Sequence, residues 1–167
     1  MVKSVRLWLA LAALVACGWW VGGVFFPSEE TKVRRVLARL EQRSNLDPKS
    51  GSLSRIARAN QLADLFDANC VIVIDGLDAG SVTLTGRADL LERALAASGA
   101  GVSVGVQFSQ TAVRIQEGGT KAVAEVAALI KAGSRQSASL ALFQLQLEQH
   151  PEGWIINRLE TIKGPRM

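Results

Sequence analysis

One apolar run near the amino terminus constrains this chain more than any other feature. It covers residues 5–26 and carries no charge after Arg6. An α-helix rises about 1.5 Å per residue, so roughly 20 apolar residues cross a hydrocarbon core about 30 Å thick. We therefore expect residues 1–27 to be an N-terminal transmembrane anchor or a signal, and residues 28–167 to form one separate domain.

The run has three interpretations. A cleaved signal peptide would have a shorter apolar centre and small residues at its end, whereas this run ends with the bulky residues Trp19, Trp20, Phe25 and Phe26. A lipoprotein lipidated at Cys17 is the second, because residues 14–17 resemble a bacterial lipobox, although no polar tether follows them. An uncleaved anchor agrees best with the length and with aromatic rings at a membrane interface, and we favour it.

The charges around the run bear on its orientation. Lys3 and Arg6 precede it and favour a cytoplasmic amino terminus, whereas the basic residues that follow favour the opposite orientation. Those later residues belong to a predicted amphipathic helix. We therefore expect a single-pass protein of the bacterial inner membrane, with its C-terminal domain on the periplasmic side and an envelope protein as a partner.

The overall charge gives no reason to expect a nucleic-acid partner. The chain carries +4, of which Lys3 and Arg6 supply +2, so the domain is nearly neutral. Its basic residues form no cluster interleaved with aromatic residues, and we expect no nucleic acid to bind. The domain has one cysteine, Cys70, so it contains no internal disulfide, and we expect this thiol to be a small buried residue.

Helical periodicity appears in three segments. Ser28 is suited to cap a helix that runs to about residue 43, with an apolar face made by Val33, Val36, Leu37 and Leu40. A second helix is expected from Ser52 to residues 67–69, including Leu65 and Phe66 on its apolar face. A third is expected over residues 86–97.

Strand patterns occupy the rest of the domain. Residues 71–74 and 82–85 form a predicted hairpin, and four antiparallel strands follow the third helix. The alternation in the first of these four shifts phase, which predicts a β-bulge at residues 109–112. The apolar pattern of residues 140–147 also indicates a change of phase. Helices that segregate from a bent sheet predict an α+β fold.

This order of elements resembles the nuclear transport factor 2-like (SnoaL-like) superfamily, and three local motifs carry the resemblance. They are a strand start at residues 69–73, a strand–Gly–Arg–helix step at residues 84–91, and a final hairpin at residues 150–156. The resemblance spans residues 28–163. It implies three helices packed on a strongly curved, mostly antiparallel sheet that forms a cone. The superfamily includes isomerases, cyclases and dehydratases as well as non-catalytic binding or dimerisation domains.

The same resemblance implies where catalytic residues would lie. Enzymes of this superfamily place Asp, His or Tyr inside the cone, but this chain has no tyrosine and a single histidine, His150. His150 falls in a predicted hairpin turn, where we expect it to be solvated and not catalytic. Asp75 and Asp78 fall in another turn, where local backbone bonding or, less readily, a metal would explain them.

Several polar residues could reach the cone or the solvent. Arg87 could hold an anionic ligand at the cone mouth, although packing at a helix end is the simpler role for it. Four residues within predicted strands could face either side of the sheet: Glu125, Gln144, Gln146 and Arg158. We assign no catalytic residue, no metal ligand and no cofactor, and we leave the ligand-binding residues open.

These observations favour a membrane-anchored, non-catalytic binding or assembly module of the cell envelope. Three helices can cover only one face of the sheet, so we expect residues 28–167 to dimerise through the other face. The alternatives are a small-molecule isomerase, cyclase or dehydratase that uses the cone pocket, and a lipoprotein lipidated at Cys17.

Overall fold

The computed structural model describes six stretches of the chain: residues 28–45, 50–77, 80–100, 103–116, 118–132 and 137–162. The predicted anchor or signal at residues 1–27, with Cys17, lies outside them. Within the described stretches, no helix is both long enough and apolar enough to span a membrane.

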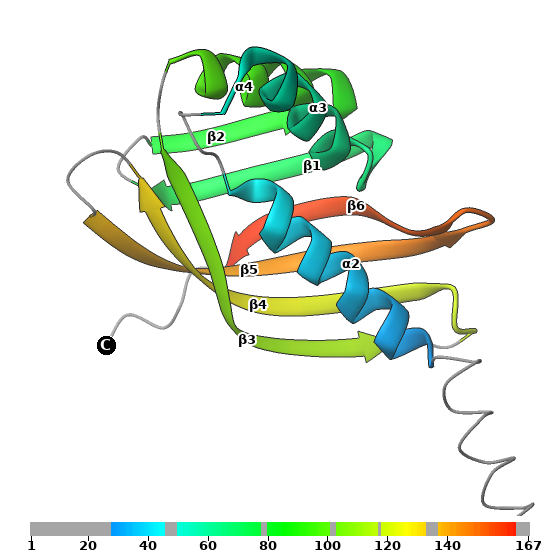
Figure 1. Cartoon of the computed structure of the whole chain (residues 1–167). Helices are drawn as coiled ribbons and strands as arrows, with labels where there is room; N and C mark the ends of the chain where they lie inside the picture. Colours follow the sequence, from blue (N-terminus) through cyan, green and yellow to red (C-terminus); the bar gives the residue numbers. More distant parts are fainter. Residues whose placement is uncertain are drawn as a thin grey trace, which may run out of the picture.

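The elements follow the predicted order of two helices, a hairpin, a third helix and four strands (Figure 1). The helices are α2 (Glu29–Ser44), α3 (Ser52–Ala63) and α4 (Arg87–Gly99). The strands are β1 (Phe66–Leu77), β2 (Gly80–Thr85), β3 (Val104–Ile115), β4 (Lys121–Ala132), β5 (Ser137–His150) and β6 (Gly153–Ile162).

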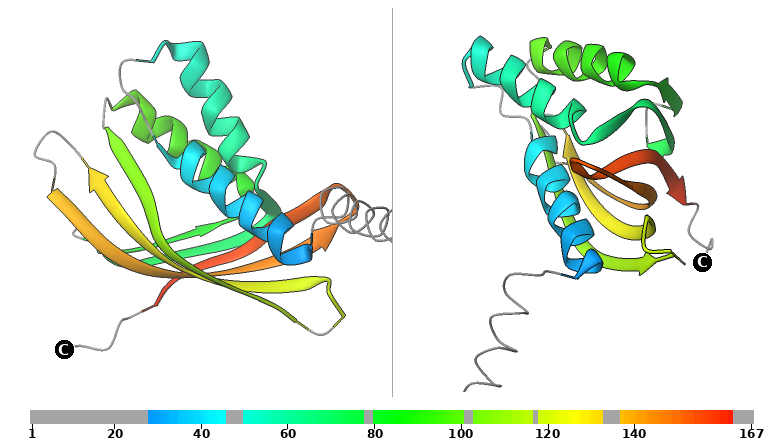
Figure 2. Two further views of the ribbon diagram at one scale, coloured as in Figure 1. Left: turned by 60° about the horizontal axis from the view of Figure 1, so that its bottom comes forward. Right: turned by 90° about the vertical axis from the view of Figure 1, so that its right-hand side faces the viewer.

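The six strands form one sheet in the order β2-β1-β6-β5-β4-β3. Neighbours are antiparallel, except that β1 and β6 are parallel. The sheet bends strongly, and all three helices lie on its concave side, with α3 and α4 together near β1 and β2 (Figure 2). The structure therefore confirms the expected α+β class, with three helices on a curved, mostly antiparallel sheet.

Helix α2 forms as its sequence predicts. The hydroxyl of Ser28 accepts a hydrogen bond from the backbone N–H of Thr31 at 3.3 Å, which caps the first turn. Glu29 and Glu30 follow in that turn, where the helix dipole favours negative charge. The predicted apolar face is buried, and its members are Val33, Val36, Leu37 and Leu40.

The prediction for the second helix was wrong at its end. Helix α3 stops at Ala63, and β1 begins at Phe66. The carbonyl oxygen of Leu65 accepts a hydrogen bond from the N–H of Ile156 on β6 at 2.9 Å. Pairing with a distant strand therefore takes this backbone out of the helix, although Leu65 and Phe66 continue the helical apolar pattern. Strand β1 is accordingly 12 residues long, far longer than the predicted 71–74.

The predicted bulge in β3 is confirmed. The register between β3 and β4 shifts between Phe108 and Gln110, which leaves Ser109 as the extra residue. Both Phe108 before the shift and Val113 after it pack against the core. The bulge thus keeps apolar side chains on the inner face although their numbering changes from even to odd.

The predicted change of phase in β5 was wrong. Strands β4 and β5 pair without a register shift from Lys121↔Glu148 to Ala132↔Ser137. Phe143, Leu145 and Leu147 are buried, whereas Leu140 and Leu142 are exposed. Apolar residues therefore occur on both faces of a regular strand. In the sequence, this arrangement looks the same as a change in the phase of the alternation.

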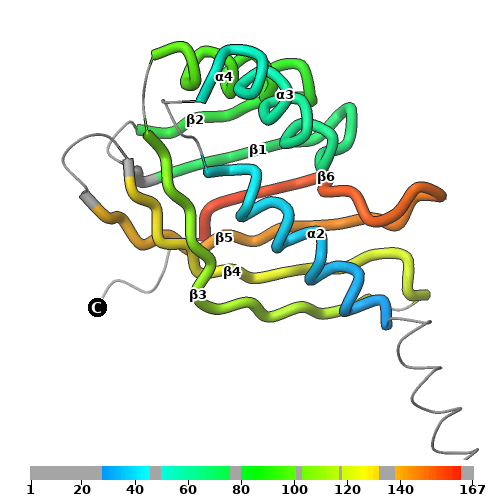
Figure 3. The backbone as a smooth tube through the Cα atoms, viewed as in Figure 1, coloured from blue at the N-terminus to red at the C-terminus, as the bar shows by residue number. Residues whose placement is uncertain are grey.

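Side chains of α2 and of its C-cap residue bind backbone N–H groups of the edge strand β3. The N–H of Phe108 donates to the Glu41 carboxylate at 3.2 Å, and the N–H of Val106 donates to the Asn45 side-chain oxygen at 2.7 Å. Figure 3 shows α2 crossing the sheet diagonally, from the end of β3 toward β1. These bonds protect part of an edge that would otherwise be free to pair with another strand.

Candidate binding cavity

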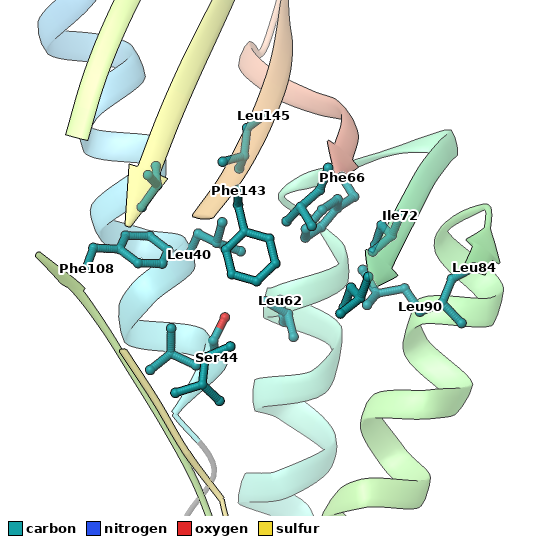
Figure 4. Close-up of a pocket in the computed structure, with 15 residues that line it drawn as sticks. Leu40, Ser44, Leu62, Phe66, Ile72, Leu84, Leu90, Phe108, Phe143 and Leu145 are labelled. Carbon is teal, nitrogen blue, oxygen red and sulfur yellow. The ribbon is translucent and has the colours of Figure 1, made fainter. Parts of the chain in front are cut away.

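A cavity of about 200 Å³ lies between the concave face of the sheet and the helices (Figure 4). Every described helix and strand contributes to its lining. Fourteen of the lining residues are apolar, and Ser44 is polar. The apolar set is Leu40, Leu62, Phe66, Ile72, Ile74, Leu84, Leu90, Val106, Phe108, Val126, Ile130, Phe143, Leu145 and Leu159.

The pleat of the strands explains why the lining is apolar. Successive side chains of a strand point to opposite faces, so alternate residues such as Phe143 and Leu145 enter the cavity together. Helix α2 contributes Leu40 and Ser44 from its last two turns, and α3 contributes Leu62. The cavity therefore lies at the carboxyl end of α2.

The lining contains no ionisable side chain among the described residues. A general acid or base must lie within hydrogen-bond reach of the reacting group, and this lining offers only the Ser44 hydroxyl. Figure 4 shows that hydroxyl oxygen on the side of the cavity where Phe143 lies. An engineered apolar cavity of about 150 Å³ in another protein stays dry and binds benzene. The cavity is thus suited to a largely apolar ligand, with one possible hydrogen bond.

The other end of α2 is closed by a different group of contacts. The Glu29 carboxylate accepts hydrogen bonds from Lys32 Nζ at 2.7 Å and from Trp154 Nε1 at 2.8 Å. The bond from Lys32, followed by the bond from Trp154, lowers the pKa of Glu29 below its usual value. Trp154 is buried at the start of β6. This contact fixes the amino end of α2 to the β5–β6 hairpin.

His150 lies at the end of β5, paired with Gly153 across the hairpin turn. It is half-buried and is not part of the cavity lining. His150 therefore ends a strand beside the turn at residues 151–152, and it is half-buried where a solvated side chain was expected.

Of the two aspartates expected in a turn, the structure describes Asp75 and not Asp78. The backbone N–H of Asp75 donates to the Thr161 hydroxyl at 3.2 Å, and Asp78 lies outside the described residues. Across the described stretches, no group of three or more His, Cys, Asp or Glu residues could hold a metal ion.

Arg87 ties two elements together instead of facing the cavity. Its Nε donates to the backbone oxygen of Phe66 at 3.0 Å, and its Nη1 lies 3.9 Å from an Asp64 carboxylate oxygen. The preceding Gly86 has a φ of +89°, and a Cβ there would lie 3.1 Å from the backbone oxygen of Ala68. The Gly–Arg step therefore shapes the turn from β2 into α4, and Arg87 has the packing role expected at a helix end.

The four polar strand residues also lie outside the lining. Glu125 pairs with Arg114, and Arg158 Nε lies 2.8 Å from a Glu160 oxygen. Gln144 is paired in register with Glu160, and Gln146 with Arg158. Each of the four residues precedes or follows an inward-facing residue of its own strand, such as Leu145 on β5. All four therefore lie on the convex face of the sheet.

Cys70 is buried at 1 % exposure, as the sequence predicted. Burial, and to a smaller extent the nearby Asp67 charge, raises the pKa of its thiol. A raised pKa favours the protonated thiol, which agrees with the place of Cys70 in the hydrophobic core.

The sequence did not single out the residues that line the cavity. The sequence predicts that these residues are apolar and belong to the apolar face of their helix or strand, for example at Val106, Phe108 and Leu62. The same pattern describes residues that fill a core completely. Only the arrangement of the helices over the sheet decides which inward side chains border a void.

No protein-family model matches this sequence, and no curated protein matches it. Solved structures do match. One is a nuclear transport factor 2-like protein with a cystatin-like fold from Novosphingobium aromaticivorans, with 17% identity, a TM-score of 0.56, and coverage of 90% of this chain and 88% of that one. Another is a nuclear transport factor 2-like protein of unknown function from Pseudomonas putida, with 11% identity, a TM-score of 0.60, and coverage of 83% and 88%.

A third match is a candidate scytalone dehydratase from Novosphingobium aromaticivorans, with 14% identity, a TM-score of 0.61, and coverage of 81% of this chain and 85% of that one. Identities this low establish an architecture and leave the chemistry undetermined. The architecture agrees with the resemblance seen in the sequence. The chain therefore has the nuclear transport factor 2-like, cystatin-like fold.

Proposed function

We propose that this protein is a non-catalytic binding module that holds a largely apolar small molecule in its cone. The observation that carries the proposal is the lining of the cavity, in which fourteen apolar side chains surround about 200 Å³ and Ser44 supplies one hydroxyl. Ligand sites are predominantly apolar clefts with a few polar groups that fix orientation. An acyl chain or an aromatic hydrocarbon matches this lining.

The enzyme alternative has weaker support. A fold neighbour is a candidate scytalone dehydratase, so the architecture is compatible with small-molecule chemistry. In the part of this chain that the structure describes, however, His150 and Asp75 are not among the lining residues. An isomerase or dehydratase would need a general base at the ligand, and the described lining offers only the Ser44 hydroxyl.

A photoreactive ligand can test the binding proposal by position. The full chain is reconstituted in lipid vesicles with a diazirine-bearing fatty acid, irradiated, digested and mapped by mass spectrometry. We expect cross-links in peptides that contain Leu62, Phe108 or Phe143. Cross-links confined to the apolar run of residues 5–26 would contradict the proposal, because they would report only the surrounding lipid.

A matched pair of substitutions sharpens this test. Val106→Trp places a large side chain in the cavity and should abolish cross-linking at Phe143. Leu140→Trp adds the same ring to an exposed position on the convex face and should leave it unchanged. Persistent cross-linking in Val106→Trp would show that the ligand lies elsewhere.

The proposal includes an anchor formed by residues 5–26, which places the domain in the cell envelope, on the periplasmic side of the inner membrane. The length and apolar character of this run support it. Full-length protein should stay in membranes after an alkaline carbonate wash, with an intact mass that includes Met1. A mature chain that begins at an acylated Cys17 would establish the lipoprotein instead.

The proposal also includes a homodimer formed through the convex face. Leu140 and Leu142 are 69% and 37% exposed there, and a depression of about 370 Å³ is bordered by Leu142, Ala127 and Ile162. The ion-paired residues Arg114–Glu125 and Arg158–Glu160 flank this apolar strip, so that a second copy could meet opposite charges.

Sedimentation of the full chain in density-matched detergent tests the dimer. Wild type should sediment as a dimer at micromolar concentration, and Leu142→Glu as a monomer. Leu53→Glu, at an exposed leucine of α3, is the matched control and should remain dimeric. A monomeric wild type would contradict the assembly part of the proposal.

A further inference from the structure

Charge is distributed unevenly between the helices and the sheet. Helices α2 and α3 together contain Lys32 and six arginines against three glutamates. The six strands contain four basic residues against five acidic ones. The nearly neutral domain therefore has a basic side, formed by α2 and α3, and a slightly acidic sheet.

Local contacts neutralise only part of this basic side. Lys32 pairs with Glu29, and Arg34 pairs with Glu30. The third glutamate, Glu41, accepts a hydrogen bond from the backbone of β3. Arg35 and Arg39 are exposed on α2, and no described carboxylate lies within 4.0 Å of their guanidinium groups.

The arginines at the junction of the two helices bind backbone oxygens, which leaves their positive charge in place. Arg43 donates to the backbone oxygen of Gln61 at 2.6 Å, and Arg58 donates to that of Asn45 at 3.0 Å. These bonds hold α2 and α3 together as one surface. They also fix these two positive charges where α2 and α3 meet, so this part of the basic surface is built into the fold.

The same side exposes two large apolar residues. Leu53 is 82% exposed and Ile56 is 46% exposed, both in the first half of α3. The right-hand view of Figure 2 shows α2 and α3 on the same side of the molecule, away from the convex face of the sheet. Cationic residues beside exposed aliphatic ones are typical of surfaces that lie at a membrane interface.

We infer that the surface formed by α2 and α3 lies against a bilayer that contains anionic lipid, with arginines at the headgroups and Leu53 and Ile56 at the interface. This inference rests on the proposed anchor, because α2 begins at Glu29, directly after the apolar run. Basic clusters next to a membrane segment bind anionic headgroups. Nucleic acid is the weaker partner, because α2 and α3 contain no aromatic side chain on which a base could stack.

A fluorescent label at two positions tests the inference in the full chain. Ala38→Cys lies on the exposed side of α2 between Arg35 and Arg39, and Gln107→Cys is an exposed control on β3. Both are made with Cys17→Ser, since Cys70 is buried. In nanodiscs with half phosphatidylglycerol, collisional quenching of the Ala38 label by a neutral aqueous quencher should fall about threefold relative to pure phosphatidylcholine. The Gln107 label should not respond.

Two double variants that each remove two positive charges distinguish an effect of this surface from an effect of the net charge. Arg35→Gln with Arg39→Gln should abolish the protection at Ala38, whereas Lys121→Gln with Lys131→Gln, which removes two exposed charges from β4, should preserve it. Equal quenching in both lipids, or equal effects of the two pairs, would overturn the inference. If the chain fails to insert, the anchor is wrong, and the labelled protein mixed with vesicles of the same lipids still reports whether this surface binds them.

Discussion

The two ends of helix α2 differ in what they do for the molecule. In its amino-terminal half, Val33 is 0% exposed and Glu29 binds Trp154, and Leu37 at the middle of the helix is 2% exposed. At its carboxyl end, Leu40 and Ser44 border the cavity. One continuous helix therefore closes the cone at one end and leaves it hollow at the other.

This difference indicates how stability and binding are divided in the fold. Side chains at the closed end are surrounded by protein, so truncating one of them leaves a cavity that lowers the free energy of unfolding. Side chains at the hollow end already border a void, and a ligand can replace the contacts that they lack. Substitutions at the closed end should change stability, and substitutions at the hollow end should change binding.

The largest expected effect comes from truncation of a side chain at the closed end. Leu37→Ala removes a buried leucine and should lower the free energy of unfolding by about 2–5 kcal/mol. The matched change Leu62→Ala, at a half-buried position of the cavity lining, should cost clearly less. Guanidinium unfolding of the full chain in mild detergent, followed by circular dichroism, measures both. Equal losses would show that the two ends are packed alike.

A smaller effect is expected from the hydrogen bond that fixes α2 to the β5–β6 hairpin. Trp154→Phe keeps most of the ring but removes the Nε1–H that donates to Glu29. It should destabilise the protein in the same assay by less than Leu37→Ala. In Glu29→Gln, where the carboxylate is absent, the same change should cost less still, and identical costs in both backgrounds would show that this bond does not couple the two residues.

The protonation of Glu29 should be visible as a pH dependence of stability at the closed end. Its pKa is lower in the folded protein than in the unfolded chain, so the stability that it contributes is present above about pH 4.3. That contribution should disappear as the pH falls through the lowered folded value. The unfolding midpoint of wild type should therefore drop more steeply below about pH 4.3 than that of Glu29→Gln. Parallel curves would assign the pH dependence to other carboxylates.

Much of this fold could be predicted from periodicity and capping. The cap of α2 at Ser28, its apolar face and the bulge at Ser109 are local properties that can be predicted from the sequence. The end of α3 and the length of β1 could not be predicted in this way. They depend on the bond between Leu65 and Ile156, which are far apart in the chain.

The cavity was the least predictable feature. Its lining residues follow the same inward pattern as fully packed core residues, and Leu145 belongs to both groups. The polar residues considered in the sequence did not indicate the cavity either, because His150 lies at a hairpin and Arg87 ties α4 to β1, as expected. The cavity depends on how far the helices lie from the sheet, and this distance cannot be predicted from any single residue.

The smallest expected effect belongs to His150, which lies in the β5–β6 hairpin but takes no part in the described hydrogen bonds of Glu29. His150→Ala should change the free energy of unfolding by no more than about 0.5 kcal/mol and leave cross-linking in the cavity intact, because this side chain is outside the lining. Unfolding and cross-linking of the variant measure both quantities. If a measured turnover were lost while the melting temperature stayed unchanged, the enzyme alternative would replace the binding module.

Methyl NMR of the full chain, titrated with benzene, tests the hollow end of the cone most directly. We expect saturable shifts at methyl groups of Leu62, Ile72 and Ile130, which line the cavity. The methyl groups of Val33 at the closed end and of Leu142 on the convex face should not shift. Shifts of equal size at all five residues, or no saturable shift at the first three, would contradict a binding cavity.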